Sequence, residues 1–167
     1  FMDGQRPKTY ADSIEALAER LDHFCESWFP PKTPLNQQRC AILRQCQQQG
    51  DLLNPGLFSL TVPTGGGKTV SSMAFALHHA KTHGLKRIVY VVPYTSIIEQ
   101  NAAVFRKILG DANVLEHHSG VLYDVGEEAT PESVRMAKAA ENWDIPIVVT
   151  TAVQFFESLF SNRPSQC

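Results

Sequence analysis

A glycine-rich turn between an apolar run and a helical pattern constrains this chain more than any other feature. Residues 57–62 (LFSLTV) have the pattern of a short buried strand, three glycines occupy 65–67, and Lys68-Thr69 opens a helical pattern. Glycine lacks a Cβ, so the backbone can turn tightly and bring its N–H groups close to an anion. The helix start adds unpaired N–H donors and the positive end of its dipole. The pattern therefore predicts a loop that wraps the phosphates of a nucleotide.

The loop has a less common form of the nucleotide-binding pattern. The usual form, G-x-x-x-x-G-K-[ST], has a glycine where this chain has Val62. The stretch fits Pro-Thr-Gly-x-Gly-Lys-Thr instead, which is similar to motif I of superfamily 2 helicases and translocases. We expect Lys68 to reach the β- and γ-phosphates as the catalytic cation and Thr69 to complete the coordination of Mg²⁺. The predicted nucleotide-binding set here is Thr64, Gly65, Gly66, Gly67, Lys68 and Thr69. A turn that merely starts a helix is the alternative.

The rest of the chain predicts an α/β fold with a parallel sheet. Two helices are expected first, near 10–28 with a capping box at Thr9 and near 35–49 with Gly50 as its C-cap. Strands near 57–62, 88–93, 112–116 and 145–150 then alternate with helices near 68–83, 95–109, 131–141 and 152–160. Residues 120–130 have the composition of a surface loop. Continuous apolar runs such as 88–92 are typical of strands covered on both faces, and strand–helix alternation predicts βαβ units.

Composition excludes several classes of protein. With 167 residues, 43% hydrophobic and 19% charged, the chain fits one ordinary globular domain. No apolar run is long enough for a membrane span, and the start is no signal peptide, so we expect a cytoplasmic location. The net charge of −2 means that any contacts with nucleic acid must be local. The four cysteines have no C-x-x-C spacing, which disfavours zinc or disulfides; Cys25 and Cys40 are expected to be packed.

Two further strand-to-helix turns carry hydroxyl groups. In an open α/β sheet such turns lie at the carboxyl edge of the strands, next to the phosphate loop. Hydroxyls and helix N-terminal amides there could hold a sugar-phosphate backbone without reading its sequence. Ordinary helix capping, for example by Thr95 or Ser96, is the alternative. The residues concerned are Pro93, Tyr94 and Thr95 in one turn and Thr150, Thr151 and Gln154 in the other.

Histidine pairs carry weaker signals. Adjacent side chains on an extended segment point to opposite faces, so His117 and His118 do not easily bind one metal ion and fit a polar turn better. His78 and His79 are expected on a partly exposed helix face.

The motifs together resemble a known family. The stretches 61–69 (TVPTGGGKT), 91–100 (VVPYTSIIEQ), 117–119 (HHS) and 149–155 (VTTAVQF) occur in that order. They are similar to the CRISPR-associated helicase/nuclease of type I interference systems, over roughly residues 35–162. The resemblance implies a RecA-like lobe that uses ATP to translocate on single-stranded DNA. That DNA comes from a target opened by an RNA-guided surveillance complex, and an HD nuclease domain degrades it.

The resemblance also implies residue roles. Pro93, Tyr94, Thr95, Thr150, Thr151 and Gln154 would line the DNA track. The segment before motif I would sense adenine, with Gln38 or its neighbour Arg39 as the contacting residue.

The chain also departs from that family. We find no acidic pair on a strand after 149–155, and Glu127-Glu128 has the surroundings of a loop. A second lobe and a nuclease domain are absent from the printed sequence. We therefore predict an incomplete RecA-like lobe over 35–167, preceded by a linker helix and Pro-rich connector over 1–34. It should bind nucleotide without hydrolysing it. Exposed apolar surface predicts a dimer or strand exchange.

Other interpretations stay open. Another superfamily 2 helicase would share motif I. A small nucleotide kinase or GTPase should carry its own acidic magnesium ligand and a base-reading element within this length, and we find neither. A non-enzymatic module would bind neither nucleotide nor single-stranded DNA.

Overall fold

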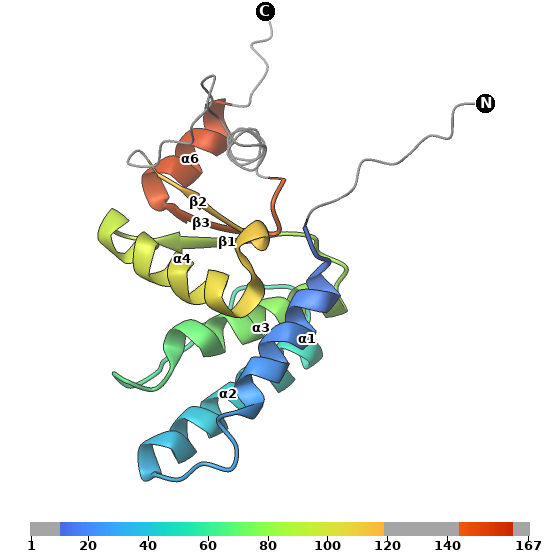
Figure 1. The fold of residues 1–167 in the computed structure, drawn as a ribbon. Helices are drawn as coiled ribbons and strands as arrows, with labels where there is room; N and C mark the ends of the chain where they lie inside the picture. The colour runs from blue at the N-terminus through green and yellow to red at the C-terminus, as the bar shows by residue number, and fades with distance from the viewer. Residues whose placement is uncertain (1–10, 119–143, 162–167) are drawn as a thin grey trace, which may run out of the picture.

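The structure, a computed structural model, describes residues 11–118 and 144–161 (Figure 1). Its helices are α1 (Ile14–Glu26), α2 (Pro34–Leu52), α3 (Lys68–Thr82), α4 (Thr95–Leu109) and α6 (Ala152–Ser161). Its strands are β1 (Ile88–Val92), β2 (Val114–His117) and β3 (Ile147–Thr151), and a 3₁₀ turn, η1 (Asp111–Asn113), precedes β2. The helix expected near 131–141 and the loop expected at 120–130 lie outside the described residues.

The three strands form a parallel sheet in the order β1-β3-β2. Val148 of the central strand faces Val89 on one side and Leu115 on the other. All five residues of β3 are buried, as expected of a strand with neighbours on both edges and helices on both faces. Helix α4 packs beneath the sheet and α6 lies above it (Figure 1). The predicted α/β class with a parallel, RecA-like sheet is confirmed.

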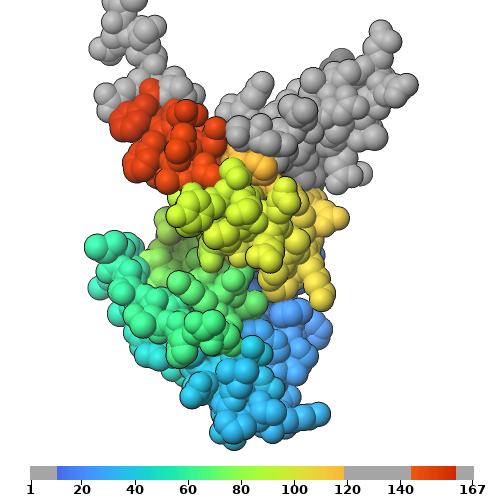
Figure 2. Space-filling view, turned by 90° about the vertical axis from the view of Figure 1, so that its left-hand side faces the viewer, coloured from blue at the N-terminus to red at the C-terminus, as the bar shows by residue number. Residues whose placement is uncertain are grey.

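Helix α1 packs against α3 and α4 through Leu17 and Leu21, both fully buried. Its N-cap is Ser13, whose hydroxyl accepts from the N–H of Ala16 at 3.2 Å. The capping box expected at Thr9 is therefore wrong: the helix starts later, where a serine side chain can reach a free N–H. In the space-filling view, α2 and α6 lie at opposite ends of the molecule (Figure 2).

Gly50 lies inside α2, which continues to Leu52, so its expected role as a C-cap is wrong. Gly50 is buried where α2 crosses α3. A Cβ placed on it would lie 2.8 Å from the carbonyl oxygen of Phe75 and 2.9 Å from the Cβ of His78. Glycine is present here because the two helices approach too closely for a side chain.

Residues 57–62 form no strand, so this expected element is wrong. Within the described part of the chain, no backbone hydrogen bond links this segment to another segment, and β1 pairs only with β3. Leu57 is fully exposed, and Phe58 and Leu60 are about two-fifths exposed. A strand-forming sequence becomes a strand only when a neighbour supplies the ladder of hydrogen bonds.

The cysteines at 25, 40 and 46 are free thiols and buried, which confirms the expected packing of Cys25 and Cys40. Burial, with the nearby charge of Asp22 and with Cys40, raises the pKa of the Cys25 thiol to about 12, so it is an inert core group. None of the described helices combines the length and apolar character that a membrane span requires.

Candidate nucleotide and nucleic-acid site

The phosphate loop is a tight turn that only glycine permits at two positions. Gly65 and Gly67 have φ values of 80° and 77°, in the left-handed region. The N–H of Gly66 donates to the carbonyl of Pro63 at 2.9 Å and closes the turn. A Cβ on Gly66 would lie 2.5 Å from Cγ1 of Val62, which replaces the usual first glycine, and 2.9 Å from the carbonyl oxygen of Pro63. The backbone oxygen cannot rotate away, so a side chain at Gly66 would also disturb the turn.

Helix α3 begins directly after this turn and leaves its first N–H groups free for a ligand. Gly67 is the N-cap and has no side chain to occupy those donors. Lys68 is exposed, and none of the ion pairs among the described residues includes it. The Thr69 hydroxyl lies 3.5 Å from Oδ1 of Asn101 on α4. The arrangement offers backbone donors and one free cation to an anion, as the sequence predicts for a phosphate site.

Two residues from the N-terminal helices support the loop. Nε of Arg39 on α2 donates to the carbonyl of Gly65 at 2.6 Å. The ring of Trp28, just after α1, approaches to within 3.4 Å of a Cβ placed on Gly67. Gln38, the first candidate for sensing adenine, is exposed and is absent from the cavity that Trp28 and Arg39 line. The geometry thus favours Arg39, the neighbouring alternative, as the residue beside the loop.

The turn between β1 and α4 leaves its polar groups accessible. Tyr94 is the N-cap of α4 and is 68% exposed, and its carbonyl accepts from the N–H of Ile97 at 3.2 Å. No side chain caps this helix, so the expected capping by Thr95 or Ser96 is wrong. Pro93 and Thr95 are exposed as well. These three residues are free to contact a ligand, and their role in DNA binding stays a prediction.

The two threonines at the end of β3 have internal partners. Thr150 is fully buried and donates its hydroxyl to the carbonyl of His117 at 2.8 Å, which ties β3 to β2. The hydroxyl of Thr151 accepts from the N–H of Gln154 at 3.3 Å and caps α6. These bonds favour the structural alternative for Thr150 and Thr151, whereas the side chain of half-buried Gln154 makes no hydrogen bond with any described residue.

His118 belongs to a polar network at the end of β2. Its Nε2 and Oε1 of Glu116 are 2.9 Å apart, and Nη1 of Arg106 donates to the other oxygen of Glu116, also at 2.9 Å. Glu99 brings a third ligand-type group within 4.8 Å. Because Arg106 already neutralises Glu116, we interpret the network as an ion-pair cluster, in line with the expected polar turn. Burial, with the charge of His118, lowers the pKa of His117.

His78 and His79 are both buried, so the partly exposed face expected for them is wrong. His78 lies between two carboxylates, 3.0 Å from Asp22 of α1 and 3.1 Å from Asp51 of α2. Nδ1 of His79 lies 3.1 Å from the carbonyl of Gly50. These histidines join three helices, a role that their spacing in the sequence does not reveal.

Comparison with known proteins agrees with this geometry. Residues 35–166 match the family described as DEAD/DEAH box helicase. The chain belongs to this helicase family. It is also 35% identical over 135 residues to "CRISPR-associated nuclease/helicase Cas3" of Haloferax volcanii, which makes it a Cas3-like superfamily 2 chain. That match covers 68% of this chain and 14% of the relative. The chain therefore spans a small part of the curated relative that it matches.

Membership of the family identifies the loop as part of a helicase-type ATP-binding module. The loop could be predicted from the sequence because the residues that would bind the phosphates are consecutive in the chain. It did not find Trp28, which lies outside the family match and ends an ordinary amphipathic helix pattern. No signal in the sequence near Trp28 points to the phosphate loop.

Proposed function

We propose that this chain is the ATP-binding part of a CRISPR-associated, ATP-dependent helicase that translocates on single-stranded DNA. In that protein it would work with an RNA-guided surveillance complex and a nuclease domain in the degradation of foreign DNA. The observation that carries the proposal is the phosphate loop, with two left-handed glycines, a free helix N-terminus and the exposed Lys68, which forms no ion pair with any described residue. The likeness to Cas3 supports the CRISPR-specific role.

We further propose that Gly65, Gly66 and Gly67 hold the phosphates and that the hydroxyl of Thr69 contributes to a Mg²⁺ site. A hydroxyl at the start of a P-loop helix suits this hard cation, which is held by one or two protein oxygens together with phosphates and water. The chain's own contribution is to position the phosphates. Among the described residues, the Thr69 hydroxyl has a hydrogen bond to the side-chain amide of Asn101 on α4 and none to a carboxylate that could serve as an acidic magnesium ligand. We therefore expect binding without turnover.

The first prediction concerns Lys68. Titration with a fluorescent ATP analogue and Mg²⁺ should show weak binding that Lys68→Ala reduces at least about tenfold, since a charge-assisted hydrogen bond contributes about 1.5–3 kcal/mol. Lys86→Ala serves as the matched control, because Lys86 is an exposed lysine in the loop after α3. Phosphate release should stay at background. Hydrolysis that needs Mg²⁺, rises with single-stranded DNA and disappears in Lys68→Ala would contradict the expected inactivity.

A short labelled single strand tests the nucleic-acid half of the proposal. The exposed turn of Pro93, Tyr94 and Thr95 lies at the start of α4, where free helix N–H groups can donate hydrogen bonds to phosphate oxygens. We expect weak binding that decreases as salt rises. A chain that binds neither the nucleotide nor the strand would favour the non-enzymatic module instead.

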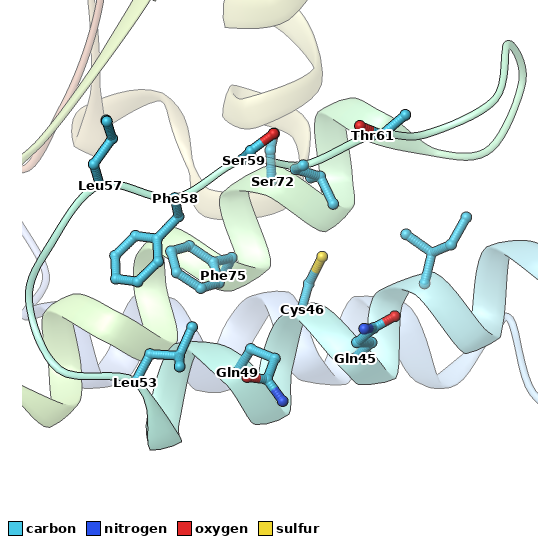
Figure 3. A pocket seen from close by; sticks show the side chains of 12 residues that line it. Gln45, Cys46, Gln49, Leu53, Leu57, Phe58, Ser59, Thr61, Ser72 and Phe75 are labelled. Atoms are coloured by element: carbon cyan, nitrogen blue, oxygen red, sulfur yellow. The ribbon is translucent and has the colours of Figure 1, made fainter.

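We also propose that the unpaired segment 57–62 associates with a second copy of the chain. The segment runs above α2 and α3 and borders an apolar groove of about 750 Å³, in which Phe58 lies beside Phe75 (Figure 3). It contains no charged residue and no proline, which are the features that protect exposed strand edges. Two copies can pair such an edge antiparallel about a twofold axis.

The second prediction tests this pairing. Leu60→Lys places a charge on the edge and should convert a concentration-dependent dimer into a monomer in sedimentation-velocity runs. Leu52→Lys is the matched control, because Leu52 is more exposed and lies at the end of α2, outside the segment. A chain that stays monomeric at all concentrations, or two variants that behave alike, would overturn the proposal.

A further inference from the structure

The Thr69 hydroxyl, which the proposed function assigns to a Mg²⁺ site, lies beside an amide group of α4. Its oxygen is 3.5 Å from Oδ1 of Asn101. This distance is long, because hydrogen bonds from a hydroxyl to an oxygen are usually about 2.7–2.8 Å. The side chain of Asn101 makes no other hydrogen bond with a residue in the described ranges. Asn101 can therefore move closer to the hydroxyl without giving up another partner.

Packing holds Asn101 next to the start of α3. Asn101 lies in the interior of α4 and is half-buried. Its neighbours Ile98 and Ala102 on the same helix are fully buried, in the same core cluster as Met73 and Ala74 of α3. The backbone of α4 is thus fixed relative to α3, and only a small rotation of the Asn101 side chain separates the long contact from a good hydrogen bond.

A second connection fixes the first turn of α3. The hydroxyl of Ser72 donates to the carbonyl of Thr69 at 3.0 Å and lies 3.2 Å from the hydroxyl of Tyr90 on β1. The ring of Tyr90 makes an edge contact with that of Phe105, a fully buried residue of α4, at 5.0 Å between centroids. Thr69 and α4 cannot separate without disturbing these contacts, so the position of the amide beside the hydroxyl is a fixed feature of the fold.

The chemistry of a hydroxyl explains why this neighbour matters for a metal. A threonine hydroxyl has one hydrogen and two lone pairs. A metal ion takes a lone pair, so the hydrogen needs an acceptor elsewhere, and an amide oxygen supplies one. The hydrogen bond fixes the rotation of the hydroxyl and leaves both lone pairs free. Hydrogen bonds of this kind orient metal ligands in many proteins and raise the affinity for the metal.

We infer that Asn101 is a positioning residue for the proposed Mg²⁺ site: its Oδ1 accepts the hydrogen of the Thr69 hydroxyl and leaves the lone pairs of that hydroxyl to the metal. The inference rests on the proposed function. It adds a residue that lies 32 positions after Thr69 and outside the four stretches that carry the family resemblance. Because Asn101 acts through Thr69, it should influence the affinity for Mg²⁺ and not the binding of metal-free nucleotide.

The test titrates Mg²⁺ into the chain with a fluorescent ATP analogue and repeats the nucleotide titration in EDTA. Asn101→Leu has a side chain of similar size without an acceptor. It should lower the affinity for Mg²⁺ about tenfold, the lower end of the range for residues that orient a metal ligand, and leave nucleotide affinity in EDTA within about twofold. Asn101→Asp keeps an acceptor, so its affinity for Mg²⁺ should equal or exceed that of the unaltered chain. Gln100→Leu is the matched control, because Gln100 is an exposed amide on the same helix.

A double-mutant cycle connects the effect to Thr69. Thr69→Ala removes the hydroxyl, so adding Asn101→Leu should lower the affinity for Mg²⁺ no further, whereas independent residues would give losses that multiply. Thermal melts verify that the variants are folded. Multiplying losses overturn the inference, as do an unchanged affinity for Mg²⁺ in Asn101→Leu, an equal loss with and without Mg²⁺, or an equal loss in Asn101→Asp. Absence of nucleotide binding to the unaltered chain, or binding that Mg²⁺ does not strengthen, overturns the proposed function and the inference with it.

Discussion

Gly50→Val is expected to destabilise the chain by about 3 kcal/mol, the upper end of the range for overpacking. The first added carbon would lie 2.8 Å from the carbonyl oxygen of Phe75 and 2.9 Å from the Cβ of His78. Neither atom can rotate away, because one belongs to the backbone of α3 and the other is fixed to it. The two helices must therefore separate. Urea unfolding followed by circular dichroism measures the loss of stability.

Gly56→Val is the matched control for this prediction. Gly56 lies in the loop after α2, where the nearest atoms to an added Cβ are 3.9 Å away, so the free energy of unfolding should change by no more than about 0.5 kcal/mol. A comparable loss in both variants would contradict the assignment to the close contact of α2 and α3, because the restriction that valine places on the unfolded chain acts in the stabilising direction. An unchanged Gly50→Val protein would show that the helices have more room than the distances indicate.

Gly50 also shows the limit of what the sequence could predict. A glycine at the end of a helical pattern is a C-cap in many proteins, and only the position of α3 decides against it here. The strand predicted at residues 57–62 was wrong for a similar reason. The apolar run 88–92 became β1 because β3 pairs with it, whereas the largely apolar run 57–62 has no paired strand within the described ranges. Local pattern predicts a tendency to form a strand, and pairing is a property of the whole fold.

The candidate site likewise has a part that could be predicted from the sequence and a part that could not. The phosphate loop could be predicted because its glycines, Lys68 and Thr69 are consecutive and their backbone chemistry is local. Arg39 lies 26 residues before Gly65, and only the path of α2 brings the two together. Thr150 is the opposite case. Its type and position predict a contact with DNA, which stays a prediction, and only the structure shows that its hydroxyl is bonded to the strand beside it.

His78→Leu is expected to lower the free energy of unfolding by about 2–3 kcal/mol at pH 7. The buried ring contacts the carboxylates of Asp22 and Asp51, which are only about two-fifths exposed, and Gln47 and Thr82 complete the cluster. Hydrogen bonds to charged groups contribute about 1.5–3 kcal/mol each, and the partial exposure of both carboxylates reduces that value. Leucine would leave two like charges facing each other across an apolar side chain.

The pH dependence makes this prediction specific. Partial burial opposes ionisation of Asp51, but the hydrogen bond and charge of His78, with smaller contributions from Thr82 and Lys81, hold its pKa below the ordinary 3.8. A carboxyl group whose pKa is lowered by folding stabilises the fold at pH values above its pKa in the unfolded chain. This contribution is lost as the pH falls through its pKa in the folded chain.

Urea unfolding of both proteins from pH 7 to pH 3 measures the effect. The difference in stability between the native chain and His78→Leu should be largest at pH 5–7. It should shrink as the pH falls below about 4 toward the lowered pKa that Asp51 has in the native fold. His23→Leu is the control, because His23 pairs with Glu26 on the surface and is 84% exposed. A difference that stays constant across this range would assign the loss to packing alone.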